Sequence, residues 1–182
     1  MRILLVNTLL FEHGGPSIYT FNLGNMLREQ GHEVEYFGMQ HPKNGDFKYS
    51  DMFLPYIDFP ELLQEGGLKN SYAVLRSMLN NRTAQIGMER VLDAFNPDIV
   101  HLQNYLHHLS PSIIRPAKER NIPIIWTLHD SVLVCPNTNL FDDHRMTPCT
   151  LCDSPLKRFI YPPFKRCKKD SLGASIAAAI EA

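Results

Sequence analysis

The sequence has 182 residues, the size of one globular domain, and its 44% hydrophobic and 20% charged residues are typical of a chain that folds around a core. Eighteen basic residues nearly balance 19 acidic ones, which disfavours a polyelectrolyte partner such as duplex DNA. The sequence has no apolar run long enough for a membrane-spanning helix, and its start lacks the pattern of a signal peptide, so a cytoplasmic protein is expected.

Short apolar runs alternate with helical patterns through the first 130 residues. The expected strands cover residues 2–7, 33–38, 98–102 and 123–128, and the expected helices cover residues 16–30, 71–95 and 110–121. Continuous apolar runs of this length indicate strands that are buried on both faces of a parallel sheet. Pro16 and Ser110 each suit the start of a helix, and Asn80-Asn81 is a candidate interruption in the second helix. The alternation predicts a doubly wound α/β domain with helices on both faces of a mostly parallel sheet.

The pattern weakens after Asp130. Residues 131–169 contain prolines, all four cysteines and many basic residues, which predicts an irregular segment. Residues 171–182 predict an Ala-rich helix that is capped by Asp170 or Ser171 and cut off before its natural end. We therefore expect one domain over residues 1–170, followed by a truncated helix.

A pair of glycines lies in the first strand-to-helix turn. Gly14 and Gly15 precede the helix that begins at Pro16, and a helix N-terminus can bind an anion through its N–H groups and dipole. The turn does not have the GxGxxG spacing of dinucleotide-binding proteins, so a plain structural turn fits the pattern equally well.

Histidines follow two of the expected strands. His107 and His108 lie in the loop after the third strand, and His129 and Asp130 follow the fourth. Ligands bind at the carboxyl ends of strands in open α/β sheets, which favours a role in a site for these residues. His101 lies inside a strand and is expected to be a hydrogen-bonded core histidine.

The four cysteines suggest a metal site. Cys149 and Cys152 have the C-x2-C spacing that allows two thiolates to bind one tetrahedral ion, and Cys135 and Cys167 flank them at similar distances along the chain. The pattern predicts one structural zinc ion. Reduced cysteines without a metal are the alternative, and an iron–sulfur cluster fits the ligand count less well.

A basic stretch with interspersed aromatic residues lies between the last two cysteines and just beyond them. It contains Lys157, Arg158, Lys165, Arg166, Lys168 and Lys169, together with Phe159, Tyr161 and Phe164. Such a composition suits an anionic lipid surface or single-stranded nucleic acid, and a solvated basic loop is the alternative.

Three segments resemble a known family when they are taken together. They are MRILLVN, HGGPSIYTFNLGNMLREQGHEVEYF and PDIVHLQNYLHHLSPSIIRPAKERNIPIIWTLHDSVLVCPN. They are similar to the N-terminal domain of family 4 glycosyltransferases of the GT-B fold, over residues 1 to about 171. The cysteine region resembles a subgroup in which TLHD is followed by CP and C-x2-C. Many relatives have the pattern VHxH, whereas here His101 is followed by Leu102 and Gln103.

The resemblance implies a retaining transferase, of the hexosyltransferase type, with two Rossmann-like domains that face a cleft and with no catalytic metal. It implies that Gly14 and Gly15 lie near the diphosphate of a nucleotide sugar, the donor substrate. His129 would lie at the reaction centre, and His107, His108 and Asp130 would line the acceptor side.

The expected function is the acceptor-binding half of such an enzyme, acting on a polysaccharide or glycolipid acceptor. The family's donor-binding domain, with its E-x7-E motif, is expected to be absent, so the chain alone would be inactive and would need that domain or a separate chain as a partner. Contact with the anionic inner face of a membrane is a further expectation, and nucleic acid is not an expected partner. The alternative is a non-enzymatic, zinc-stapled module that binds anionic lipid or single-stranded nucleic acid, for which salt-dependent nucleic-acid binding would be diagnostic. An NAD-dependent enzyme is disfavoured because GxGxxG is missing.

Overall fold

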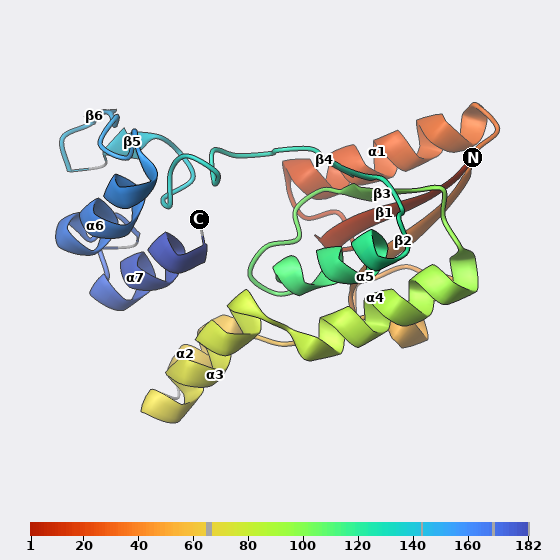
Figure 1. Ribbon diagram of the computed structural model, residues 1–182, viewed down its shortest axis with the longest axis horizontal. Helices are drawn as coiled ribbons and strands as arrows, with labels where there is room; N and C mark the ends of the chain where they lie inside the picture. The colour runs from red at the N-terminus through yellow and green to blue at the C-terminus, as the bar shows by residue number, and fades with distance from the viewer. Residues whose placement is uncertain (65–66, 143, 169, 182) are drawn as a thin grey trace. The chain divides into compact units, whose positions relative to one another are not determined.

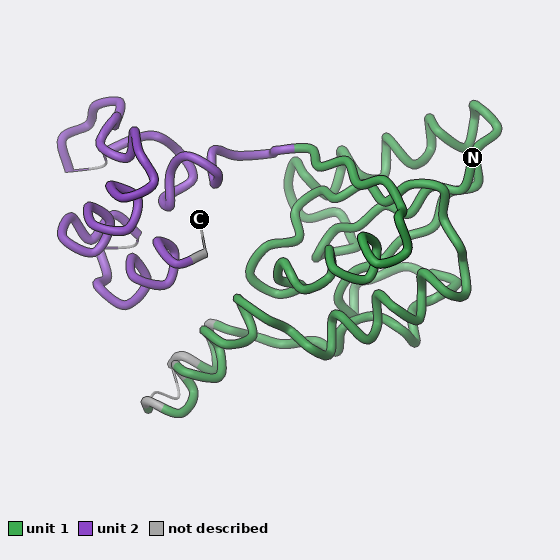
Figure 2. Tube along the Cα trace, in the orientation of Figure 1, with its two compact units in different colours: residues 1–127 green, residues 128–182 purple. Residues whose placement is uncertain are grey.

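A computed structural model describes residues 1–64, 67–142, 144–168 and 170–181 of the chain (Figure 1). The chain divides into two compact units, residues 1–127 and 128–182 (Figure 2). Sequence analysis predicted one domain through residue 170. The division comes earlier because the hydrophobic core cluster, including the side chains packed around it, extends no further along the chain than Trp126.

The first unit is built on a four-stranded parallel sheet. Its strands are β1 (Arg2–Leu9), β2 (Glu33–Met39), β3 (Ile99–Leu102) and β4 (Ile124–Trp126), in the order β2-β1-β3-β4. The four strands predicted from the sequence are therefore confirmed. The central strand is β1, in which Leu4, Leu5 and Val6 are fully buried. Because successive side chains of a strand point to opposite faces, this burial requires cover on both faces of the sheet.

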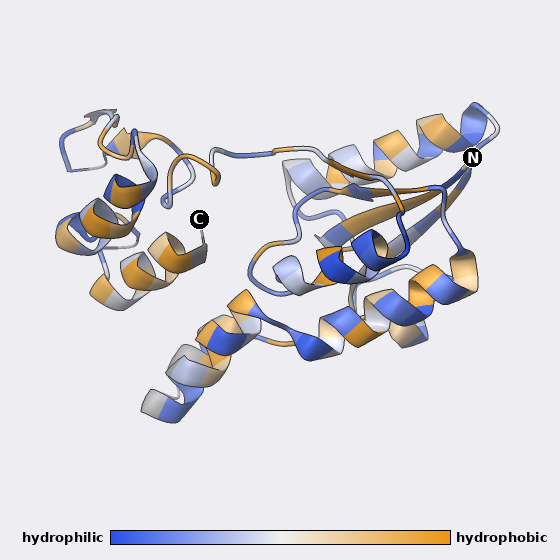
Figure 3. Ribbon diagram, viewed as in Figure 1, coloured by the Kyte–Doolittle hydropathy of each residue, from blue (hydrophilic) through white to orange (hydrophobic). Residues whose placement is uncertain are grey.

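Helices supply that cover. The connection from β1 to β2 contains α1 (Gly15–Glu29), whereas α4 (Arg82–Phe95) precedes β3 and α5 (Ile114–Glu119) joins β3 to β4. After β2 the chain passes back beyond β1 to form β3, and α1 consequently lies on one face of the sheet and α4 and α5 on the other (Figure 1). In Figure 3 apolar and hydrophilic residues alternate along α1 and α4, as expected for helices that pack one side on a sheet. This architecture confirms the predicted Rossmann-like, doubly wound α/β fold.

Between β2 and α4 the chain forms three elements, which are η1 (Ser50–Met52), α2 (Phe59–Gln64) and α3 (Leu68–Leu79). The break between α3 and α4 falls at the predicted Asn80-Asn81. The Asn81 side chain caps α4, because its Oδ1 accepts a 3.0 Å hydrogen bond from the backbone N–H of Ala84. Ser110 is also a cap, as predicted, since its hydroxyl accepts a bond from the N–H of Ser112 at the start of η2 (Pro111–Ile113).

The second unit contains a small hairpin and two helices. Its strands β5 (Phe141–Asp142) and β6 (Thr147–Pro148) are antiparallel, and its helices are α6 (Pro155–Lys165) and α7 (Leu172–Glu181). The prediction that residues 131–169 are irregular is therefore wrong for α6. Pro162 and Pro163 lie in its last turns, where each removes one helical hydrogen bond, and the helix is supported by its packing against α7.

The predicted C-terminal helix is confirmed, with Ser171 as its cap. The hydroxyl of Ser171 accepts a 3.3 Å hydrogen bond from the N–H of Ala174. The last residue of the predicted range, Ala182, lies outside the described residues. Within the described part of the chain, no helix is both long enough and apolar enough to cross a bilayer.

Candidate functional site

The carboxyl ends of β1 and β3 lie next to each other at the point where the chain reverses direction across the sheet. Two backbone hydrogen bonds join them beyond the regular ladder, from Gln103 N–H to the carbonyl of Val6 and from Thr8 N–H to the carbonyl of Asn104, both 2.8 Å long. In open α/β sheets this reversal point is where ligands bind. It is therefore the place in the first unit where a substrate site is expected.

Asn7 organises this edge, and sequence analysis did not identify it as a site residue. Its side chain is almost fully buried, and its Nδ2 donates to the carbonyl of Leu9 at 2.7 Å and to the hydroxyl of Ser17 at 3.3 Å. Its Oδ1 accepts a 3.1 Å hydrogen bond from the N–H of Asn104. Asn7 thus ties the end of β1 to helix α1 and to the loop after β3. The available signal was a polar residue within an apolar strand run.

The glycine turn stands beside this network. Gly14 has a φ of 79°, the left-handed region that favours glycine, and it caps α1 without a side-chain hydrogen bond. Space is open where a Cβ would stand on either Gly14 or Gly15, and the first turn of α1 has no acidic residue. An exposed helix N-terminus whose first turn carries no carboxylate favours an anion, because no acidic side chain within that turn compensates its dipole and N–H groups.

One buried polar atom at the end of β1 lacks a partner. The side chain of Thr8 is only 7% exposed, and among the described residues its Oγ1 has no hydrogen-bond partner. A buried hydroxyl in this state costs free energy unless a bound group or water supplies the bond. Asn7 and Thr8 together form a polar edge at the end of β1.

The histidines after β3 have different surroundings. His107 lies in the loop with a φ of 69°. The ring of His108 stacks on Phe59, with centroids 4.4 Å apart and planes inclined by 4°, and its carbonyl accepts a 2.8 Å bond from Asn81 Nδ2. His101 Nε2 lies 2.8 Å from the hydroxyl of Thr127, which confirms the expected hydrogen bond, although the residue is half-buried and not in the core.

His129 and Asp130 belong to the second unit, whereas Gly14, Gly15, His107 and His108 belong to the first. Burial lowers the pKa of His129 below its ordinary 6.5, and the nearby charge of Asp130 opposes this effect. Asp130 also accepts a 2.9 Å hydrogen bond from the N–H of Val132. Burial therefore favours the neutral form of the imidazole. Its expected place on one edge with the glycine turn stays a prediction.

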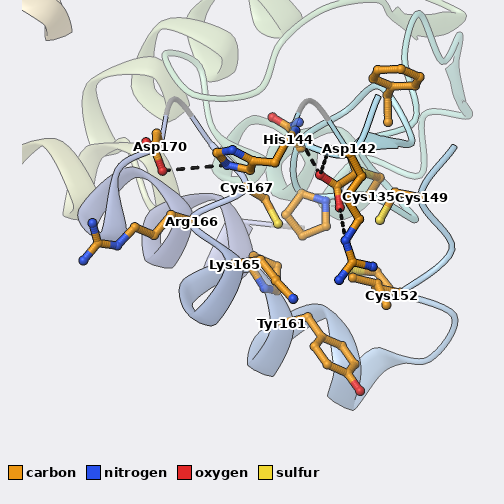
Figure 4. A pocket seen from close by; sticks show the side chains of 16 residues that line it. Cys135, Asp142, His144, Cys149, Cys152, Tyr161, Lys165, Arg166, Cys167 and Asp170 are labelled. Carbon is orange, nitrogen blue, oxygen red and sulfur yellow. Dashed lines mark hydrogen bonds and ion pairs between the residues drawn. The ribbon is translucent and has the colours of Figure 1, made fainter. Parts of the chain in front are cut away.

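All four cysteines line one cavity of about 350 Å³ in the second unit (Figure 4). They are free thiols, with Cys135 buried and the other three half-buried. Burial, reinforced by the neighbouring thiols, raises the pKa of Cys152 to about 11 and also raises that of Cys167. Among the described residues, no three His, Cys, Asp or Glu side chains are already arranged as a metal site.

The basic stretch forms most of α6 rather than a loop. Lys157 Nζ lies 2.8 Å from a carboxylate oxygen of Asp153, and Arg158 donates to the carbonyl of Leu133. Phe159 and Phe164 are 55% and 83% exposed. Lys169 of the predicted stretch lies outside the described residues.

Comparison with known proteins identifies one family. The sequence model of the family described as Glycosyltransferase Family 4 matches residues 13–167, a range that begins just before the glycine turn and ends at the last cysteine. No curated protein and no solved structure matches the chain.

Proposed function

The chain belongs to glycosyltransferase family 4, because the family match covers most of its residues. On that premise we propose that it is the acceptor-binding half of a retaining glycosyltransferase. The donor is a nucleotide sugar, and the acceptor is a polysaccharide or a glycolipid. The family match supports a transferase and disfavours the alternative of a non-enzymatic zinc-stapled module. The donor-binding surface would come from a second domain or from a separate chain, and no catalytic metal takes part.

The observation that carries this proposal is the polar edge at the ends of β1 and β3. The open turn at Gly14 and Gly15 would receive the diphosphate of the donor, since a phosphate can approach backbone N–H groups most closely where no side chain intervenes. The hydrogen bonds of Asn7 hold this turn's flanking segments in place before the substrate arrives. Positioning of this kind supplies much of the rate of a transfer between two bound substrates.

The acceptor side is assigned to His107, His108 and Asp130, and the reaction centre to His129. A neutral imidazole can accept a proton from an acceptor hydroxyl or donate a hydrogen bond to the departing phosphate, and burial favours that neutral form in His129. Transfer replaces the bond between the anomeric carbon and the phosphate oxygen with a bond to the acceptor oxygen. The acceptor loses its hydroxyl proton and the nucleoside diphosphate leaves.

Nucleotide binding tests the assignment of the glycine turn. We expect nucleoside diphosphates to shift the backbone NMR signals of Gly14, Gly15 and Ser17 in the 182-residue chain. Gly14→Ala should weaken this binding, because alanine disfavours a φ of 79°. The matched control is Gly45→Ala, an exposed glycine with open space and no left-handed φ. Shifts confined to other elements, or equal loss of binding in both variants, would overturn the assignment.

Turnover tests the remaining roles. The chain alone should release no nucleotide from a panel of nucleotide sugars, with or without saccharide and lipid acceptors. When a family donor-binding domain is joined to it, His129→Ala should lower turnover by about 10²–10³-fold, the usual contribution of a positioned group near developing charge. Full activity in that variant would remove His129 from the site.

A contact with anionic lipid fits the exposed face of α6. Leu156, Phe159, Ile160 and Phe164 are between 43% and 83% exposed, and their spacing places them on one side of the helix. Basic side chains at Lys157, Lys165 and Arg166 lie next to them in the sequence. An apolar stripe with adjacent cations is typical of a helix that lies in the interface of an anionic membrane. Such a contact would bring a lipid-linked acceptor to the enzyme.

A further inference from the structure

The second unit has very little hydrophobic core. The core cluster of buried side chains lies between Ile3 and Ala117, entirely within the first unit. Among the described residues of the second unit, the buried hydrophobic side chains are those of Val132, Cys135, Ala178 and Ala179. A unit of this size rarely folds on so small an apolar core, and small proteins of this kind usually depend on disulfides or a structural metal ion.

The cysteines come from three separate segments of the second unit. Cys135 follows the first turns of the unit, Cys149 and Cys152 follow β6, and Cys167 follows α6. Each of the three segments therefore contributes at least one thiol to the same cavity (Figure 4). A bond among these thiols would join the hairpin, the end of α6 and the start of the unit.

The other potential ligands in this cavity are already engaged. Asp142 Oδ1 accepts hydrogen bonds from the N–H groups of His144 and Arg145, at 3.0 and 3.1 Å. His144 Nε2 lies 3.8 Å from a carboxylate oxygen of Asp170. The thiols, in contrast, form no disulfide. A set of four sulfur ligands selects a soft or borderline ion with tetrahedral geometry, which is the preference of zinc.

We propose that Cys135, Cys149, Cys152 and Cys167 bind one zinc ion that holds the second unit in its folded form. The described side chains are not already closed into a metal site, so binding would draw together the turns that carry the thiols. Formation of a structural zinc site commonly supplies the folding free energy that a small core cannot. The site is structural and separate from the polar edge of the first unit, so the proposal does not depend on the assigned transferase activity.

Metal analysis of the 182-residue chain tests the ligand set. Protein produced with zinc in the medium and purified without chelator should contain about one zinc ion per chain, since one tetrahedral site takes four thiolates. Cys149→Ser and Cys152→Ser should each lose most of the zinc. Thr150→Ser is the matched control, because it places the same new residue at an exposed position between the two ligands. Cobalt in place of zinc should give the intense visible absorption of a tetrahedral thiolate complex.

The single tryptophan separates the two units in a folding measurement. Trp126 lies in β4 of the first unit, where its indole N–H donates to the carbonyl of Gln103, so its fluorescence reports on that unit. Removal of zinc with a strong chelator should reduce the helical circular dichroism that arises from α6 and α7 and leave Trp126 fluorescence unchanged. Zinc added back should restore the helical signal.

Three outcomes would overturn the proposal. The first is a chain that stays free of zinc even after refolding with excess zinc, while its helical signal is complete. The second is zinc retained in the Cys149→Ser and Cys152→Ser variants, which would place the ion elsewhere. The third is native protein whose mass and thiol count show disulfides or an iron–sulfur cluster at these cysteines.

Discussion

Asn7 in β1 accepts a 3.1 Å hydrogen bond on its side chain from the backbone N–H of Asn104, a residue 97 positions later in the chain. The same amide group donates to the carbonyl of Leu9 and to the hydroxyl of Ser17. A single buried side chain therefore joins the end of β1, the first turn of α1 and the loop after β3 at the reversal point of the sheet. Two consequences follow, one for stability and one for the substrate site.

Asn7→Ala should destabilise the first unit by about 1–3 kcal/mol, because the N–H of Asn104 and the carbonyl of Leu9 would each lose a hydrogen bond to this buried side chain. Urea unfolding followed by Trp126 fluorescence measures the change. Asn22→Ala provides the control, since Asn22 is exposed on α1. If the two variants were equally stable, Asn7 would not be the link between these segments. Nucleoside diphosphate affinity should also fall in Asn7→Ala at temperatures where the variant is folded.

Asn81→Ala should cost about 2–3 kcal/mol of stability, because it removes the cap of α4 and the hydrogen bond to the carbonyl of His108. The neighbouring Asn80 is exposed, and Asn80→Ala should change the free energy of unfolding by less than about 0.5 kcal/mol. Denaturant unfolding of the pair gives the comparison. A similar loss in both variants would mean that any asparagine in the helix break matters equally.

Gly87→Ala should destabilise the chain although alanine is the better helix former by about 1 kcal/mol. A Cβ on Gly87 would stand 2.3 Å from the carbonyl oxygen of Met52 and 3.3 Å from Phe37. Displacing this backbone should cost about 1–3 kcal/mol net. Gly173→Ala in α7 is the counterpart, because nothing lies within 4 Å of its Cβ position, and it should stabilise the second unit. Thermal unfolding should show a lower midpoint for Gly87→Ala and a higher midpoint for Gly173→Ala than for the unchanged chain. A stabilised Gly87→Ala would contradict the close packing of α4 on η1.

His129 should titrate below its ordinary pKa of 6.5, because burial disfavours the charged imidazolium. The folded protein then binds this proton more weakly than the unfolded chain does. The neutral His129 ring therefore makes its full contribution to stability above the pKa that this group has in the unfolded chain. That contribution declines as the pH falls from the unfolded pKa toward the lower pKa of the folded protein. NMR titration of the His129 ring gives the midpoint. Asp130→Asn should lower that midpoint further by removing the opposing charge, and a midpoint that rises in this variant would refute the assignment.

Vesicle binding should depend on the exposed face of α6. We expect the chain to cosediment with phosphatidylglycerol vesicles and to bind phosphatidylcholine vesicles weakly, with attachment reduced at high salt. Phe159→Ser combined with Phe164→Ser should lower binding by at least about tenfold, given the apolar area removed. Ile86→Ser, at an exposed apolar position on α4, is the control. Equal binding to both lipids would indicate that α6 does not recognise anionic membranes.

Much of the fold was predictable because its signals are local. The four strands are short apolar runs, and the helix ends coincide with Pro16, Ser110 and Ser171, whose preferences act within one helical turn. Helix α6 was not predictable in this way. Its two prolines argue against a helix locally, and its support comes from α7, which follows it in the sequence.

The sequence by itself determined the fold class, the family and the candidate chemistry, because apolar periodicity, caps and motif spacing are encoded over a few residues. Only the tertiary structure decided the strand order β2-β1-β3-β4, the role of Asn7 and the gathering of four cysteines around one cavity. These features depend on contacts between residues far apart in the chain. Such contacts form when the core closes around β1 and the short elements of the second unit fold against one another, and no local pattern specifies them.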